Sequence, residues 1–225
     1  MKKIVFYTEL AYVLGLCLLA FGTALTAYGG FGISMVVAPA YILHLYLSQF
    51  FPFFSFGMAE YMLQALILLL MMLFLRKAKL SYLLSFAAAI VYGLFLDGAM
   101  KLTGYLPENL FGQIGAYIFG VLLCCSAIAL LFASYLPPAA YEMFVKELSC
   151  KYSKPIHVVK TVYDCGSLAL ALILSLAFFQ NFAGIGIGTV ICAFFYGTII
   201  RSFQNLYRKC FDFTDKFSLR KHFKS

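Results

Sequence analysis

The sequence predicts an all-α integral membrane protein with six transmembrane helices, arranged as two inverted three-helix repeats. Three observations support this fold class. Of the 225 residues, 64% are hydrophobic and 12% are charged, whereas soluble domains are about 25% charged. The apolar residues gather in runs of spanning length, since a helix needs about 20 residues to cross a bilayer. Finally, the two halves of the chain share short motifs in the same order.

Six apolar runs are long enough to span a membrane. The first run follows two lysines, as a signal peptide would, but Glu9 interrupts its start and the repeat requires it, so we interpret it as a retained helix. Two further stretches, 32–54 and 136–155, begin with Gly or Pro breakers, and each has room for an additional short helix or a re-entrant segment. The six runs cover residues 8–28, 55–75, 82–100, 112–134, 157–179 and 186–206.

The distribution of basic residues predicts the topology. Lysine and arginine gather before the first run, at 76–79, between the fourth and fifth runs, and after residue 206, whereas the other connections carry little charge. Basic loops favour the cytoplasmic side of a membrane. We therefore expect both termini in the cytoplasm and the protein in the plasma membrane. The net charge of +8 indicates orientation in this setting, and nucleic acid is not an expected partner.

An internal repeat relates the two halves. "AYVLG" at 11–15 matches "AYIFG" at 116–120, and "AAAIVYG" at 87–93 matches "ICAFFYG" at 191–197. Each half holds three spans, an odd number, so the halves must insert with opposite orientation, as in many secondary transporters. The small residues of the second motif, among them Gly93 and Gly197, predict close helix packing. The expected units are 1–108, 109–210 and a basic cytoplasmic tail, 211–225.

The strongest site candidates are polar side chains deep in the second and fifth runs. Glu60 and Gln64 share one helix face, and Lys160 and Asp164 occupy the matching positions of the other half. Charges at membrane depth are costly and usually functional. We expect these four to converge on a substrate or ion site, with Tyr92 and Tyr196 lining it. The alternative is internal neutralisation, in which Lys160 only pairs with Asp164.

Three more charges form a second tier of candidates. Asp97 and Arg201 occupy matching repeat positions, so inversion would put them at opposite faces of the membrane. Lys101 is the expected i, i+4 partner of Asp97. Arg201 fits a headgroup anchor, because arginine can reach the interface at little cost, or a clamp for an anionic headgroup or substrate. Glu142 lies in a stretch that is typical of an amphipathic interfacial helix.

Part of the second half resembles a known family. "LPPAAYEMFVKELS", "VVKTVYDCGSLAL" and "GIGT" (186–189) resemble the corresponding segments of the YczE/YitT-like bacterial membrane proteins. The resemblance places Glu142, Lys160 and Asp164 where that family has Asp, Arg and Glu. In the first half, "GGFGISMVVAPAYILHLYLS" followed by "SFGMAEYMLQ" resembles the version in a subgroup of that family, so the likeness covers nearly the whole chain. This chain departs from the family in having prolines in place of the Gly-rich start of the first segment and in lacking the acidic residue of the first half. It implies a fold and a membrane location and says little about chemistry.

These patterns favour a small transporter or permease that moves an unidentified small solute or ion by alternating access around a midplane polar cluster. The alternative is a non-transporting accessory or sensor protein that binds lipid or another membrane protein. We expect no enzyme, cofactor or metal site, because the three histidines are scattered and the seven cysteines show no ligand spacing. The lipid bilayer is the expected partner, and a homo-oligomer or a second membrane protein remains open.

Overall fold

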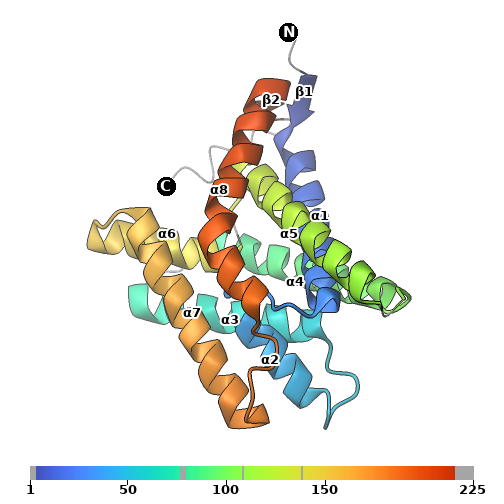
Figure 1. Cartoon of the computed structure of the whole chain (residues 1–225). Helices are drawn as coiled ribbons and strands as arrows, with labels where there is room; N and C mark the ends of the chain where they lie inside the picture. The colour runs from blue at the N-terminus through green and yellow to red at the C-terminus, as the bar shows by residue number, and fades with distance from the viewer. Residues whose placement is uncertain (1–3, 77–79, 108, 138, 216–225) are drawn as a thin grey trace.

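The computed structural model describes residues 4–76, 80–107, 109–137 and 139–215. Within these ranges the chain folds into eight helices and two short strands (Figure 1). The order long, short, long, long occurs twice. The first set is α1 (Thr8–Gly29), α2 (Ala38–Leu47), α3 (Phe56–Leu75) and α4 (Leu80–Thr103). The second set is α5 (Leu110–Ala133), α6 (Ala140–Tyr152), α7 (Ile156–Phe179) and α8 (Ile187–Cys210).

Each of the six apolar runs forms a long helix, whose ends lie within about four residues of the predicted ones. The two stretches left over each contain one short helix, α2 and α6. Helices α1, α3, α4, α5 and α7 are long and apolar enough to cross a membrane. The sixth long helix, α8, is as long as α5 and carries its charges in its second half. The chain is therefore a helical protein of the membrane-spanning class.

A pair of short strands was not predicted. Strand β1 (Ile4–Tyr7) pairs in parallel with β2 (Phe211–Thr214), with Ile4 opposite Phe211. Both strands lie at the top of Figure 1, so the two described ends of the chain are neighbours. The start of the predicted tail is thus part of the folded structure, and residues 216–225 of that tail lie outside the described residues.

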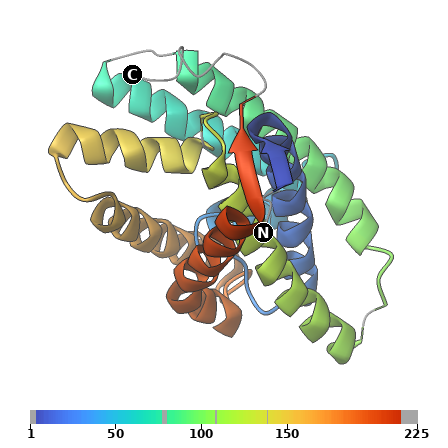
Figure 2. The same ribbon diagram turned by 90° about the horizontal axis from the view of Figure 1, so that it is seen from above.

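The long helices do not share one direction. In Figure 1, α8 lies above α7 and both run up the view, whereas α3, α4 and α6 lie across it. Figure 2, seen from above, agrees: α7 and α8 are foreshortened, and α3, α4 and α6 extend across the picture. The arrangement therefore does not give one bundle axis along which spans can be counted.

Helices α1 and α5 pack against each other in antiparallel register through small residues. A Cβ added to Gly22 would come within 2.8 Å of the Gly120 carbonyl oxygen, and one added to Gly15 within 3.3 Å of the Ala127 carbonyl oxygen. Glycine lets two helix backbones approach this closely. The two halves are offset by 105 residues, so Gly15 corresponds to Gly120 and Gly22 corresponds to Ala127. The Gly15–Ala127 and Gly22–Gly120 contacts are therefore equivalent in the two halves. This packing explains the matched AYxxG motifs.

The packing of the remaining helices is only partly symmetric. Helix α1 packs on α4 as α5 packs on α8, and both short helices pack between α3 and α7. Helix α3 also packs along α4, where a Cβ on Gly57 would overlap the Gly93 carbonyl oxygen. In the described part of the chain, α7 and α8 make no comparable contact. The predicted packing role is therefore confirmed for Gly93 and wrong for Gly197, because a Cβ at Gly197 would meet no atom within 4 Å.

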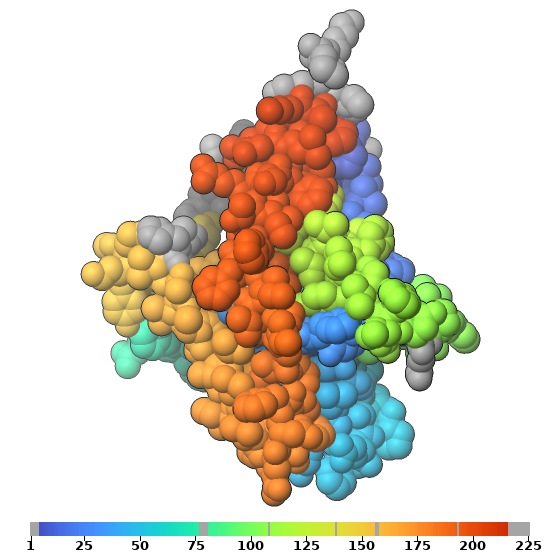
Figure 3. Space-filling view, in the orientation of Figure 1, coloured from blue at the N-terminus to red at the C-terminus, as the bar shows by residue number. Residues whose placement is uncertain are grey.

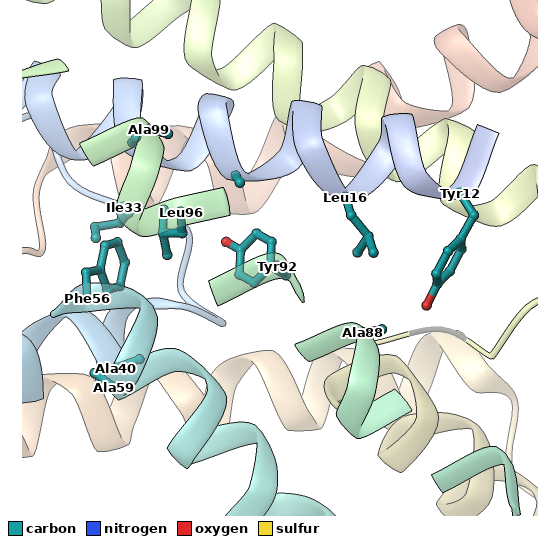
Figure 4. Close-up of a cluster of buried hydrophobic side chains, with 12 residues drawn as sticks. Tyr12, Leu16, Ile33, Ala40, Phe56, Ala59, Ala88, Tyr92, Leu96 and Ala99 are labelled. Carbon is teal, nitrogen blue, oxygen red and sulfur yellow. The ribbon is translucent and has the colours of Figure 1, made fainter. Parts of the chain in front are cut away.

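The apolar core lies between α1, α3 and α4. Figure 4 shows Tyr12 and Leu16 leaving α1 on the same side, toward Tyr92 and Ala88 of α4. On the outside, α7 and α8 occupy the front of the space-filling view in Figure 3. Large apolar side chains on these two helices are exposed, including Val162, Ile173 and Phe194, as expected for surfaces that face lipid tails.

The α1–α5 packing predicts a matched pair of glycine variants. Gly22→Leu should lower the melting temperature of the detergent-purified protein, because overpacking a filled interface costs about 1–3 kcal/mol. Gly115→Leu, in the same helix pair, should leave the melting temperature unchanged or slightly raised, since a Cβ there meets no atom within 4 Å and glycine is a poor helix former. Equal losses in both variants would contradict this packing.

Candidate functional site

A cavity of about 350 Å³ lies where all six long helices and α6 come together. Its wall is largely apolar, with polar side chains contributed by α3, α6 and α7. The cavity brings together all six of the strongest candidates and one of the second tier, and it leaves out Asp97 and Arg201. The candidates that line it are Glu60, Gln64, Tyr92, Glu142, Lys160, Asp164 and Tyr196.

Glu60 is the deepest of these charged groups, with 0% of its surface exposed. Its Oε1 atom accepts hydrogen bonds from the Tyr141 hydroxyl at 2.9 Å and from Gln64 Nε2 at 3.2 Å. Its Oε2 atom is buried and has no hydrogen-bond partner among the described residues. A buried polar atom without a partner is costly, so Oε2 is suited to bind a ligand or a proton.

Gln64 connects this carboxyl group to the start of α6. Its Oε1 atom accepts a hydrogen bond from the Ala140 backbone N–H at 3.3 Å. The first N–H groups of a helix have no partner within the helix, and α6 has no side-chain cap of its own. The Tyr12 hydroxyl donates to the Pro137 carbonyl at 2.9 Å and holds the preceding segment. Helix α6 therefore begins beside the cavity because α1 and α3 fix it there.

Lys160 and Asp164 form the predicted i, i+4 ion pair on α7, with 3.3 Å between Nζ and Oδ1. Their side chains are 44% and 19% exposed, so the pair contributes little to stability. Lys160 is the only lysine or arginine among the described residues that line the cavity, whereas Glu60, Glu142 and Asp164 all line it. Internal neutralisation thus accounts for Asp164 and leaves the other two carboxyl groups without a cation of their own.

Glu142 lies in the first turn of α6, half-buried at the cavity wall. Burial raises the pKa of this carboxyl group; the nearby Lys160 ammonium opposes the rise, and the charge of Asp164 adds to it. The ionised form is therefore less favourable in the folded protein than in the unfolded chain.

The two tyrosines of the repeat have different surroundings. The Tyr92 hydroxyl donates to Thr23 Oγ1 at 3.1 Å, and Thr23 in turn donates to the Leu19 carbonyl at 2.9 Å, which ties α4 to α1. Tyr196 lines the cavity from α8, next to Gly197. Because α8 does not pack along α7, the second half leaves open a surface that the first half closes.

Asp97 has a structural role that the sequence reading missed. Its Oδ1 accepts from the Gly57 N–H at 2.7 Å and its Oδ2 from the Ser55 hydroxyl at 2.6 Å, so it caps the start of α3. The expected ion pair with Lys101 is wrong: within the described chain Asp97 makes these bonds instead, because unpaired helix N–H groups lie closer. In the second half, Pro155 stands at the position that matches Ser55, and α8 does not pack along α7. Arg201, which matches Asp97, is exposed.

The comparison with known families places this geometry in context. Residues 6–205 match the model of a family of unknown function, DUF6198. The chain belongs to this family. No curated protein and no solved structure matches the chain. The DUF6198 match runs from β1 into α8 and includes the whole cavity.

Sequence reasoning missed several residues around the cavity. Tyr141, which binds Glu60, had no signal that set it apart from the other 15 tyrosines. The GIGT motif proves to be a packing element: the Gly188 N–H donates to the Phe31 carbonyl at 2.8 Å, and Gly32, at φ 105°, lies against Thr189. Only glycine adopts that conformation readily.

Among the described residues, no three His, Cys, Asp or Glu side chains gather as metal ligands.

The capping role of Asp97 predicts a contrast with its neighbour on the same helix. Asp97→Ala should lower the free energy of unfolding by about 1–2 kcal/mol, the usual cost of losing a helix cap. Lys101→Ala should change it by less than about 0.5 kcal/mol, as exposed surface substitutions do. Thermal melting of both variants in detergent measures the difference. A larger loss for Lys101→Ala would restore the ion-pair interpretation.

The raised pKa of Glu142 predicts a pH-dependent effect on stability. Because the folded state holds this proton more tightly, Glu142 stabilises the fold fully below its ordinary pKa of 4.5 and loses that contribution as pH rises through the folded pKa. Glu142→Gln should therefore melt higher than the native protein at pH 8, with the gap shrinking toward pH 4.5. A gap that widens at low pH would reverse the sign and contradict the assignment.

Proposed function

We propose that this protein is a small secondary transporter or permease, which moves a small solute or ion through the central cavity by alternating access. The observation that carries the proposal is the convergence of Glu60, Glu142, Asp164 and Lys160, from three helices of both halves, on one buried cavity. Charged side chains inside a membrane protein usually mark substrate or ion pathways. Substrate sites of repeat-built transporters lie where the repeats meet.

The proposed architecture is two inverted repeats, 1–108 and 109–210, with six spans including α8. The equivalent glycine contacts of α1 with α5, and the position of both short helices between α3 and α7, support it. The paired terminal strands support an even number of spans, because they put the chain ends together. The basic segments favour cytoplasmic termini in a plasma membrane. The resemblance to YczE/YitT-like bacterial proteins, including GIGT, fits this plan.

The proposed gate is the start of α6. Two contacts from α3 hold it beside the cavity, the Gln64 bond to the Ala140 N–H and the Tyr141 bond to Glu60. A solute or proton that competes with the Tyr141 hydroxyl for Glu60 would weaken one of these contacts and release α6. Binding at the cavity is thereby coupled to a change at one of its walls, which alternating access requires.

The second candidate is an accessory or sensor protein that binds lipid or another membrane protein. The exposed apolar faces of α7 and α8, which do not pack along each other in the described chain, favour it. In this case the cavity would be static, and the charges around it would serve only to position α6. A homo-oligomer through the same faces belongs to this alternative.

Cysteine labelling in membrane vesicles separates the two candidates without knowledge of the substrate. The test uses a variant whose native cysteines are replaced. Ser34→Cys then places a reporter in the cavity wall near the proposed outer side, and Thr161→Cys places one near the proposed cytoplasmic side. Adding Glu60→Gln should shift their reaction rates with a membrane-impermeant maleimide in opposite directions, by about threefold or more, because a changed balance between two states exposes one side and covers the other.

The matched control is Asp212→Asn, an exposed residue of β2 outside the cavity, which should leave both labelling rates unchanged. Rates that stay constant in Glu60→Gln, or that rise together, would indicate a static or merely loosened cavity. Either result would contradict alternating access and favour the accessory protein.

A further inference from the structure

The unpartnered oxygen of Glu60 indicates a ligand site in the cavity. Oε1 already accepts from Tyr141 and Gln64, while Oε2 is buried beside the cavity with no hydrogen-bond partner in the described chain. Both protein donors are neutral, so they do not compensate a negative charge. A carboxylate at such a position requires a cation or a bound proton, because isolated buried charges are strongly disfavoured.

The charge balance of the cavity favours a cation over an anion. Three carboxyl groups, Glu60, Glu142 and Asp164, and a single ammonium group, Lys160, line it within the described residues. Lys160 is engaged by Asp164 at 3.3 Å. An anionic ligand would therefore meet an excess of like charge and no free basic partner. A positively charged ligand would pair with the Glu60 carboxylate and reduce the repulsion between the three carboxyl groups.

Size and wall composition indicate what kind of cation fits. A volume of about 350 Å³ is far larger than the ~30 Å³ of one water molecule, so a bare ion would leave most of it unfilled. Most of the wall is apolar, with rings contributed by Tyr12, Tyr92, Tyr117, Tyr141 and Tyr196. Apolar walls bind the body of an organic ligand, and tyrosine faces attract cations.

Inorganic cations fit this cavity less well. Divalent calcium takes six to eight oxygen ligands, whereas the described residues hold no group of three or more acidic, histidine or cysteine side chains placed to bind a metal. An ammonium group differs, because it carries its own N–H donors and one of them can serve a single carboxylate oxygen.

We propose that the cavity binds a small monovalent organic cation, a protonated amine with an apolar body, whose N–H donates to Glu60 Oε2 once the carboxyl group turns toward the cavity. The inference rests on the proposed function and names the substrate class for that site. The carboxylate supplies the charge, the tyrosines and aliphatic residues enclose the body, and the pairing of Lys160 with Asp164 leaves no free basic group for an anion. The same cation would draw Glu60 toward itself and compete with the Tyr141 hydroxyl.

A charge series on the purified protein tests this inference. We would measure the melting temperature against rising concentrations of 2-phenylethylammonium, 2-phenylethanol and phenylacetate, which keep a similar body and differ in charge. A ligand that binds only the folded state raises the melting temperature with its concentration. The expected result is a saturable rise with the ammonium alone. Sodium and potassium chloride, at equal ionic strength, should produce no such rise.

Glu60→Gln and Asp212→Asn form the matched pair of variants. Glu60→Gln should weaken the apparent affinity for 2-phenylethylammonium by at least about tenfold, because a buried charge pair loses one member, and Asp212→Asn should leave it unchanged. If Glu60→Gln does not fold, the charge series on the native protein still decides. A rise with phenylacetate or 2-phenylethanol equal to that with the ammonium would overturn the inference, as would a saturable rise with sodium or potassium alone.

The two proposals fail separately. Opposite labelling shifts at Ser34→Cys and Thr161→Cys, without a response to the ammonium, would keep alternating access and reject the cationic substrate. A Glu60-dependent response to the ammonium, with constant labelling rates, would keep the cation site and reject transport.

Discussion

Helix α6 begins inside the protein, and that start depends on two side chains of α3. A helix leaves its first N–H groups without internal partners, and in a membrane protein such groups have to be satisfied by the protein itself. Gln64 meets this requirement at Ala140, while Glu60 receives the Tyr141 hydroxyl one residue later. The same two contacts that complete α6 also place a carboxyl group in the wall of the cavity. The residues that hold α6 in place are therefore also residues of the proposed site.

The antiparallel packing of α1 and α5 forms the frame around the start of α6. Its glycine contacts bring the two halves together at a short distance, and the short helices α2 and α6 fill the space between α3 and α7. The halves then diverge. In the first, Asp97 caps α3 and Gly57 allows α4 to pack closely. In the second, Arg201 occupies the position that matches Asp97 and is exposed, and Gly197 lines the cavity. In the first half, α3 and α4 pack closely together, whereas in the second half α7 and α8 stay apart and leave room for a ligand.

The sequence predicts the helices and the membrane class well, because runs of apolar residues have few other folded solutions in a chain of this composition. It also selects Glu60, Gln64, Lys160 and Asp164, because polar residues are rare in such runs. It could not predict Asp97 as a cap, since the N–H of Gly57 lies 40 residues away and i, i+4 reasoning considers only one helix. Tyr141 and the β1–β2 pair were missed for the same reason: their partners are distant in the chain.

Charge movement across a membrane tests the central claim most directly. Proteoliposomes adsorbed on a solid-supported membrane would be exposed to a concentration jump of 2-phenylethylammonium, whose uncharged amine form carries no current when it crosses lipid unaided. A cation transporter that uses Glu60 predicts a transient current in the native protein and in Asp212→Asn, and its loss in Glu60→Gln. A native current no larger than that of protein-free liposomes, or an equal current in Glu60→Gln, would contradict cation transport through Glu60.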